Sequence, residues 1–189
     1  MRQLDLFVSF LCGEFNNDKQ IEKENKGGNI IHPKARHINN ICNNKINNLP
    51  ENFDGYFIIE ESYYEQGTFK KILPHLFLFT ENSEGKVVLT SYDLPKDVDK
   101  EDFRNNNENL VMDYNELQVS EKFTPMTYEF VNNGFQGESI SHFTPVTTFT
   151  LNERTEEDIL YVSEIFRKDG KITFGFEDPI VYNRIRKFQ

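Results

Sequence analysis

The sequence lacks tryptophan entirely, and it holds only two cysteines, Cys12 and Cys42, in 189 residues. Two cysteines form at most one disulfide and exclude a disulfide framework, so we expect a protein of a reducing compartment, the cytoplasm. No run approaches the roughly 20 apolar residues that a membrane helix needs. The apolar N-terminal stretch carries Asp5 and Glu14 and no small-residue cleavage site, and it is therefore a poor signal peptide.

Basic residues are also scarce, with 21 Lys and Arg against 31 Asp and Glu and a net charge of −10. An acidic chain without a basic cluster argues against nucleic acid as a partner. The four histidines have no metal-ligand spacing and no CxxC pair occurs, so we expect no metal site. The G-x-S-x-G, phosphate-loop and dinucleotide-binding motifs are all missing.

Aromatic residues are abundant, with 18 Phe and 8 Tyr. Leu4, Phe7, Val8, Leu11 and Phe15 recur at helical spacing, which predicts a helix over residues 3–18 within an N-terminal part, 1–20. The polar, Gly-containing stretch 21–33 is predicted to be a loop. Residues 33–189 then show eight to ten short strands separated by turn signals, which is typical of an antiparallel barrel. We therefore expect one all-β domain over residues 1–189.

The stretch "FDGYFIIEESYYEQGTFKK", residues 53–71, alternates with a period of two. Phe57, Ile59, Glu61 and Tyr63 are expected on one face, with the opposite face, including Glu60, exposed to solvent. Tyr64 is expected on that solvated face too. Glu61 is read either as a pocket group or as a surface charge. Of the neighbours Lys70 and Lys71, only one can face the same way as the aromatic wall.

Several motifs together resemble the T-type phycobiliprotein lyases, the CpcT/CpeT family. "LCGEFNNDKQ" is similar to the end of that family's N-terminal helix, and "GYFIIEESYYEQGTFKK" is similar to its "EQAY…PYRxR" segment. "FQG", "DGK…FG" and "IVYNR" follow in the family's order and spacing. The resemblance covers nearly the whole chain, although no single motif is decisive.

This resemblance implies a lipocalin-like (calycin) barrel that binds a linear tetrapyrrole, a bilin such as phycoerythrobilin or phycocyanobilin. It implies attachment of the bilin by a thioether to a cysteine of a phycobiliprotein β subunit, with the bilin as substrate and no tightly held cofactor. Glu61 and Glu164 are the expected catalytic residues. The expected ligand-binding residues are Phe57, Tyr63, Phe69, Lys70 and Tyr128.

The sequence departs from the family pattern at several of these places. The two arginines of "PYRxR" read Lys70 and Ile72, and lysine lacks the bidentate fork of arginine. The family's aspartate falls on Ser163 or Glu164, and the register leaves both open. Pro125 and Thr144 stand near the positions of the family's cysteines, so a covalent enzyme–bilin intermediate is not expected.

Two other readings stay open. The barrel is either a carrier that binds a bilin without attaching it or a binder of a different apolar ligand. A homodimer through a Phe-rich side of the barrel is a further possibility.

Overall fold

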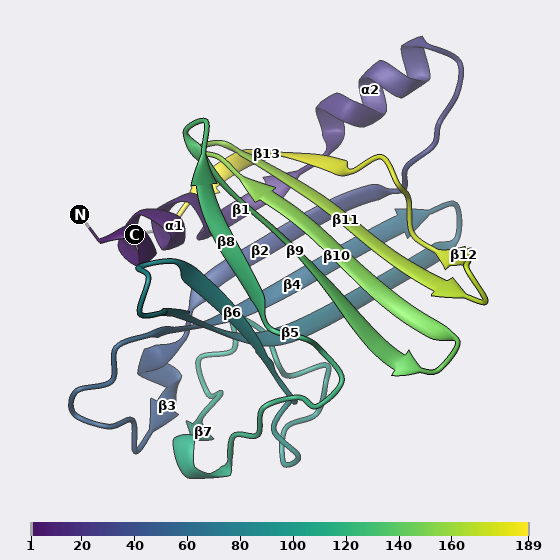
Figure 1. Ribbon diagram of the computed structural model, residues 1–189. Helices are drawn as coiled ribbons and strands as arrows, with labels where there is room; N and C mark the ends of the chain where they lie inside the picture. The colour runs from purple at the N-terminus through teal and green to yellow at the C-terminus, as the bar shows by residue number, and fades with distance from the viewer. Residues whose placement is uncertain (1, 189) are drawn as a thin grey trace.

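The computed structural model of the protein describes residues 2–188 and consists of one large antiparallel sheet with two short helices (Figure 1). The helices are α1 (Gln3–Leu11) and α2 (Asp18–Lys26), and two single-turn 3₁₀ helices lie at Asn43–Lys45 and Tyr114–Glu116. The strands are β1 (Gly13–Asn16), β2 (Lys34–Ile41), β3 (Ile46–Asn47), β4 (Tyr56–Gln66), β5 (Phe69–Glu81), β6 (Val87–Tyr92), β7 (Met112–Asp113), β8 (Met126–Val131), β9 (Gly134–Thr144), β10 (Thr147–Thr155), β11 (Ile159–Lys168), β12 (Lys171–Phe174) and β13 (Ile180–Lys187).

The sheet closes on itself to form a barrel. Its strand order is β10-β9-β8-β6-β5-β4-β2-β1-β13-β11, and β10 pairs with β11 to complete a ring of ten strands. β12 extends β11 outside this ring, and β3 and β7 form a separate parallel pair. The prediction of an antiparallel, lipocalin-like barrel with an N-terminal helix is therefore confirmed. None of the described helices has the length and apolar character to cross a membrane.

Helix α1 covers one end of the barrel. Its apolar stripe of Leu4, Phe7, Val8 and Leu11 is buried, and the Phe7 ring lies 4.6–5.2 Å from the rings of Phe79, Tyr128 and Phe135 inside the barrel. Because these rings come from three different strands, the helix fastens distant parts of the wall to each other. This end of the barrel is closed.

The predicted helix over residues 3–18 is too long. It ends at Leu11, and residues Gly13–Asn16 form β1, which pairs with both β2 and β13. Phe15 is buried because it points inward from this strand, not because it continues the helical stripe. The predicted loop 21–33 is wrong in its first part, where α2 extends to Lys26. Since α2 buries none of its residues, it lacks the apolar periodicity that would reveal it in the sequence.

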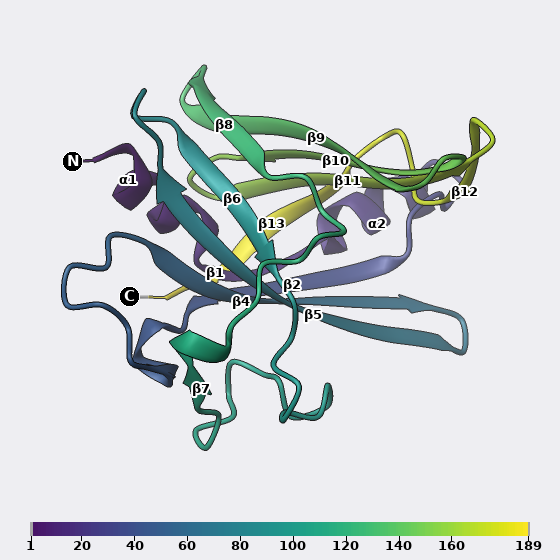
Figure 2. The same ribbon diagram turned by 60° about the horizontal axis from the view of Figure 1, so that its bottom comes forward.

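The side chains of the sheet bury two separate apolar clusters, one on each face of β4. Ile58 and Tyr64 point into the barrel and belong to the cluster around α1. Phe57 and Ile59 point outward and pack with Phe103 and other residues of the segment that follows β6. Figure 2 shows this segment, with β7, on the outer side of β4 and β5. The predicted faces of β4 are thus reversed with respect to the barrel, and Glu60 and Tyr64 are buried inside it instead of solvated.

Candidate functional site

The barrel interior carries three inward-facing carboxylates, Glu60 on β4, Glu153 on β10 and Glu164 on β11. The Tyr128 hydroxyl donates to Glu153 Oε1 at 2.9 Å, and the Tyr64 hydroxyl donates to Glu164 Oε2 at 3.1 Å. Strand alternation places these groups on the inner face, because their neighbours in register, such as Val162 beside Glu153, also belong to the interior cluster.

Glu60 lies in a cluster with two histidines. Its Oε1 accepts from Ser62 Oγ at 3.0 Å and lies 3.4 Å from His75 Nδ1, while Oε2 lies 3.9 Å from His37 Nδ1. Burial opposes ionisation of Glu60, but the imidazoles and the hydroxyl outweigh it, so that its pKa lies below the usual value. Burial alone would lower the pKa of His75, but the hydrogen bond to Glu60 and its negative charge outweigh burial, so that the pKa of His75 is raised. The two groups therefore stabilise each other's charged forms, the carboxylate of Glu60 and the imidazolium of His75.

Glu153 has the opposite behaviour. Burial, and after it the negative charge of Glu60, raise its pKa from 4.5 to about 8. At neutral pH Glu153 is therefore mostly an uncharged carboxylic acid that can donate a proton. Two carboxyl groups whose surroundings push their pKa values apart are the usual pattern of an acid and an anion that share one site.

A pocket of about 190 Å³ lies where the interior opens, between the β4–β5 and β11–β12 hairpins. Tyr64, Glu164 and Tyr182 line its inner part, and Phe69, Lys71 and Phe174 line its rim. The Tyr182 hydroxyl is buried and has no hydrogen-bond partner among residues 2–188. A buried hydroxyl without a partner costs free energy, which a polar ligand atom at this place would recover.

An aromatic wall extends from this pocket along the inner face of β9, β10 and β11. The Phe149 and Phe166 rings lie 4.7 Å apart, and Phe143 meets Phe166 edge to face at 5.4 Å. Phe149 is buried, whereas Phe143 and Phe166 remain partly exposed although they point inward. Inward-facing rings that stay accessible to solvent offer a flat apolar ligand a surface for stacking.

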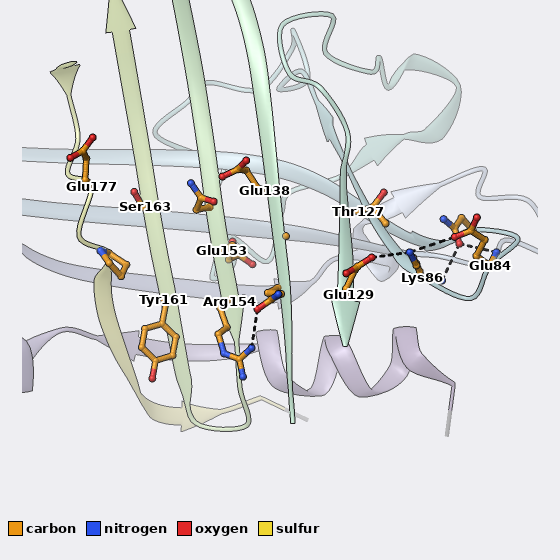
Figure 3. Close-up of a pocket in the computed structure, with 15 residues that line it drawn as sticks. Glu84, Lys86, Thr127, Glu129, Glu138, Glu153, Arg154, Tyr161, Ser163 and Glu177 are labelled. Carbon is orange, nitrogen blue, oxygen red and sulfur yellow. Dashed lines mark hydrogen bonds and ion pairs between the residues drawn. The ribbon is translucent and has the colours of Figure 1, made fainter. Parts of the chain in front are cut away.

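A larger hollow, of about 910 Å³, lies outside the barrel on the outer face of β8–β11 (Figure 3). Its side chains are mostly polar or charged, and several are bonded to one another, as in the pair of Lys86 Nζ with Glu129 Oε1 at 2.9 Å. It is an open part of the surface, and of the three interior carboxylates it reaches only Glu153, whose side chain is buried. We therefore place the candidate site inside the barrel, despite the smaller volume there.

The structure brings three of the predicted site residues to the interior or its mouth. Glu164 and Phe69 line the mouth pocket, and Tyr128 is fully buried beside Glu153. Phe69 is 54% exposed, so it belongs to the rim. These three positions fit a ligand site that opens between the two hairpins.

The other predicted residues lie on the outer side of the barrel. Glu61 is buried there and accepts from the backbone N–H and Nδ2 of Asn105, both at 2.8 Å, and from the Tyr63 hydroxyl. The Tyr63 ring is covered by the Arg36 guanidinium at 4.5 Å. Phe57 packs in the outer cluster, and Lys70 lies 3.4 Å from Glu65 at the surface. Glu61 is therefore neither the expected pocket group nor a surface charge but an anchor for an outer loop.

Sequence reasoning missed most of the inward-facing ionisable residues. The alternation of side chains along the strands is visible in the sequence. However, β4 is buried on both faces, so hydrophobicity does not show which of its faces points into the barrel. The residues missed are His37, Glu60, Tyr64, Lys71, His75, Glu153 and Tyr182.

Neither cysteine contributes to the interior site. Burial raises the pKa of Cys12 and of Cys42 to about 12, so neither is a thiolate at neutral pH. Within residues 2–188, no group of three or more His, Cys, Asp or Glu side chains is arranged to hold a metal ion. Comparison of the chain with models of known families, with curated proteins and with solved structures gives no match.

Proposed function

We propose that this chain binds an open-chain tetrapyrrole, a bilin, inside its barrel and attaches it by a thioether to a cysteine of a phycobiliprotein β subunit. The observation that carries this proposal is the combination of an accessible aromatic wall with inward-facing carboxylates that open toward a basic rim. The resemblance of the sequence to the T-type lyases supports the same ligand.

Each part of a bilin has a counterpart on the barrel wall. The conjugated rings stack on Phe143 and Phe166, which are partly exposed. The protonated pyrrole nitrogens donate to Glu164, which lies at the mouth, and the Tyr182 hydroxyl supplies a further polar contact. Lys71 at the rim attracts a propionate.

The size of the mouth pocket determines how the ligand lies. A pocket of about 190 Å³ is smaller than the roughly 300–1,000 Å³ of a site that encloses a drug-sized ligand. It therefore holds one end of the bilin, while the remainder lies along the aromatic wall. This arrangement leaves the reactive end near the mouth, where a partner protein can reach it.

The thiol comes from the partner, because both cysteines of this chain are buried and protonated. A sulfur–carbon bond forms at the exocyclic ethylidene carbon of ring A, and the thiol proton ends on the adjacent ring carbon. Glu164 holds the pyrrole protons during this addition and orients the ring. This chain binds, orients and excludes water, which is the whole of its part in the reaction.

The test combines binding and attachment. Purified protein mixed with phycocyanobilin or phycoerythrobilin should sharpen and red-shift the bilin absorption. Coexpression with a β subunit and a bilin source should give a coloured adduct that survives acid denaturation. Glu164→Gln should lower the yield of adduct, whereas Glu138→Gln, an exposed change on the outer face of the barrel, should leave it unchanged. An unaltered bilin spectrum would disprove the proposal.

One observation favours a carrier as the second candidate. Glu153, the carboxyl that is protonated at neutral pH, bonds to Tyr128, which contacts Phe7 of the closing helix. The best proton donor therefore lies at the closed end, away from the mouth where a thiol would arrive. Bilin binding without an acid-stable adduct would establish the carrier, and no response to either bilin would favour another apolar ligand.

A further inference from the structure

The turns of the β4–β5, β9–β10 and β11–β12 hairpins lie on the side of the barrel away from α1, and the β4–β5 turn stands apart from the other two (Figures 1 and 2). We call residues 65–72, 144–147 and 167–174 the hairpin end. The Asp169 backbone N–H donates to the Val146 carbonyl at 2.9 Å and joins two of the turns. The Lys71 ammonium lies 5.5 Å from the centre of the Phe174 ring and joins the third.

The hairpin end presents large apolar side chains to solvent on each of the three turns. Phe69 is 54% exposed on the first, Val146 47% on the second, and Ile172 and Phe174 43% and 44% on the third. Single exposed apolar residues are ordinary, but four on three turns at the same end of the barrel are typical of an interaction surface.

The same end is positively charged in an otherwise acidic protein. Its three segments contain five basic and two acidic residues, a net charge of +3, while the whole chain has a net charge of −10. Lys70 pairs with Glu65 and Arg167 with Glu177. Lys71, Lys168 and Lys171 make no ion pair with any residue between 2 and 188. A surface with this charge favours an anionic partner.

We propose that the hairpin end docks on the surface of an anionic lipid bilayer. Phe69, Ile172 and Phe174 enter the boundary between headgroups and acyl chains, and the lysines lie at the lipid phosphates. The apolar side chains project from three separate turns, so a rigid protein partner would need three matching depressions, whereas a bilayer adapts to them. A second copy of this chain in the same orientation is disfavoured, because two ends of net charge +3 repel each other.

Docking in this orientation would place the mouth pocket against the bilayer, because Phe69 and Phe174 belong both to the hairpin end and to the rim of the pocket. A partner protein would then reach the mouth only after the chain leaves the membrane. An apolar ligand would then pass between pocket and membrane without crossing water. The docking itself is independent of the ligand, and it stands whether or not that ligand is a bilin.

The experiment is co-sedimentation of the purified full chain with vesicles. We expect binding to phosphatidylcholine vesicles that contain 30% phosphatidylglycerol, weaker binding as salt rises, and little binding to phosphatidylcholine alone. The double variant Lys168→Ala, Lys171→Ala should weaken vesicle binding about 25-fold, since each lysine contributes about fivefold to binding at an anionic surface. The pair Lys96→Ala and Lys100→Ala, exposed on the outer loop, is the matched control and should leave binding unchanged.

A second pair of variants tests insertion. The double variant Phe69→Ser, Phe174→Ser should weaken vesicle binding by about tenfold or more. The control double variant Val111→Ser, Ile185→Ser, at residues at least as exposed elsewhere on the surface, should leave binding unchanged. Circular dichroism checks that each variant is folded.

Two results would overturn the proposal. One is the absence of binding to the anionic vesicles at 50 mM salt. The other is vesicle binding that is weakened by the lysine variants but not by the phenylalanine variants, together with equal binding to soluble polyglutamate. This combination would identify an acidic protein as the partner. Either result leaves the bilin absorption test untouched, so the two proposals fail separately.

Discussion

The raised pKa of Glu153 predicts a specific dependence of stability on pH. Its pKa is 4.5 in the unfolded chain and about 8 in the folded barrel, where burial and Glu60 oppose its ionisation. The unfolded state therefore loses this proton first, and stability falls as pH rises from 4.5 until it levels above pH 8. At about 1.4 kcal/mol per pH unit, the loss between pH 5.5 and pH 8 is at most about 3 kcal/mol.

Glu153→Gln removes this ionisation and keeps an oxygen that accepts from Tyr128. We therefore expect the variant to lose about 3 kcal/mol less than the wild type between pH 5.5 and pH 8. Urea unfolding followed by far-UV circular dichroism measures this difference, since the chain has no tryptophan to report by fluorescence. Glu138→Gln, which changes an exposed carboxylate, should keep the wild-type profile. Parallel profiles for wild type and Glu153→Gln would refute the assignment of a neutral Glu153.

Three further substitutions test the packing around the site. Phe7→Ala should destabilise the barrel by about 3–5 kcal/mol in urea unfolding, because it leaves a cavity among the rings that close one end. Gly175→Ala should lower the melting temperature far more than Gly170→Ala. Both glycines have a positive φ, but a Cβ at Gly175 would lie only 1.7 Å from the Glu164 carbonyl oxygen, whereas a Cβ at Gly170 would meet no atom within 4 Å. Asn105→Ala should cost about 1–3 kcal/mol, because buried Glu61 loses a donor, and it should make the outer loop more susceptible to limited proteolysis.

The fold could be predicted because a period of two with regular turn signals is a strong indication of an antiparallel barrel. Closure by β1 could not be predicted. Its four residues follow a helix directly, and Phe15 satisfies helical and strand spacing equally well. The helix α2 was missed because it is held by polar contacts, including Gln20 Nε2 to the Pro179 carbonyl at 3.1 Å, and not by an apolar stripe.

The site was only partly predictable for a related reason. Glu164 is a candidate through the resemblance and Tyr128 is one of the expected ligand-binding residues, and both point inward. Glu61 was chosen over Glu60 because its neighbours on the strand are apolar, but those neighbours pack against an outer loop that is distant in sequence. Alternation gives two faces, and only the long-range packing decides which of them is the inside.

The place of β1 between β2 and β13 has a consequence for biosynthesis. Residues 13–16 pair with residues 183–187, so the ring of hydrogen bonds cannot be completed until nearly all of the described chain has left the ribosome. Until then β11 has only some of its neighbours, and the aromatic inner wall is open to water. Such late, non-local pairing makes folding slow, and it leaves apolar surface exposed to aggregation until the ring closes.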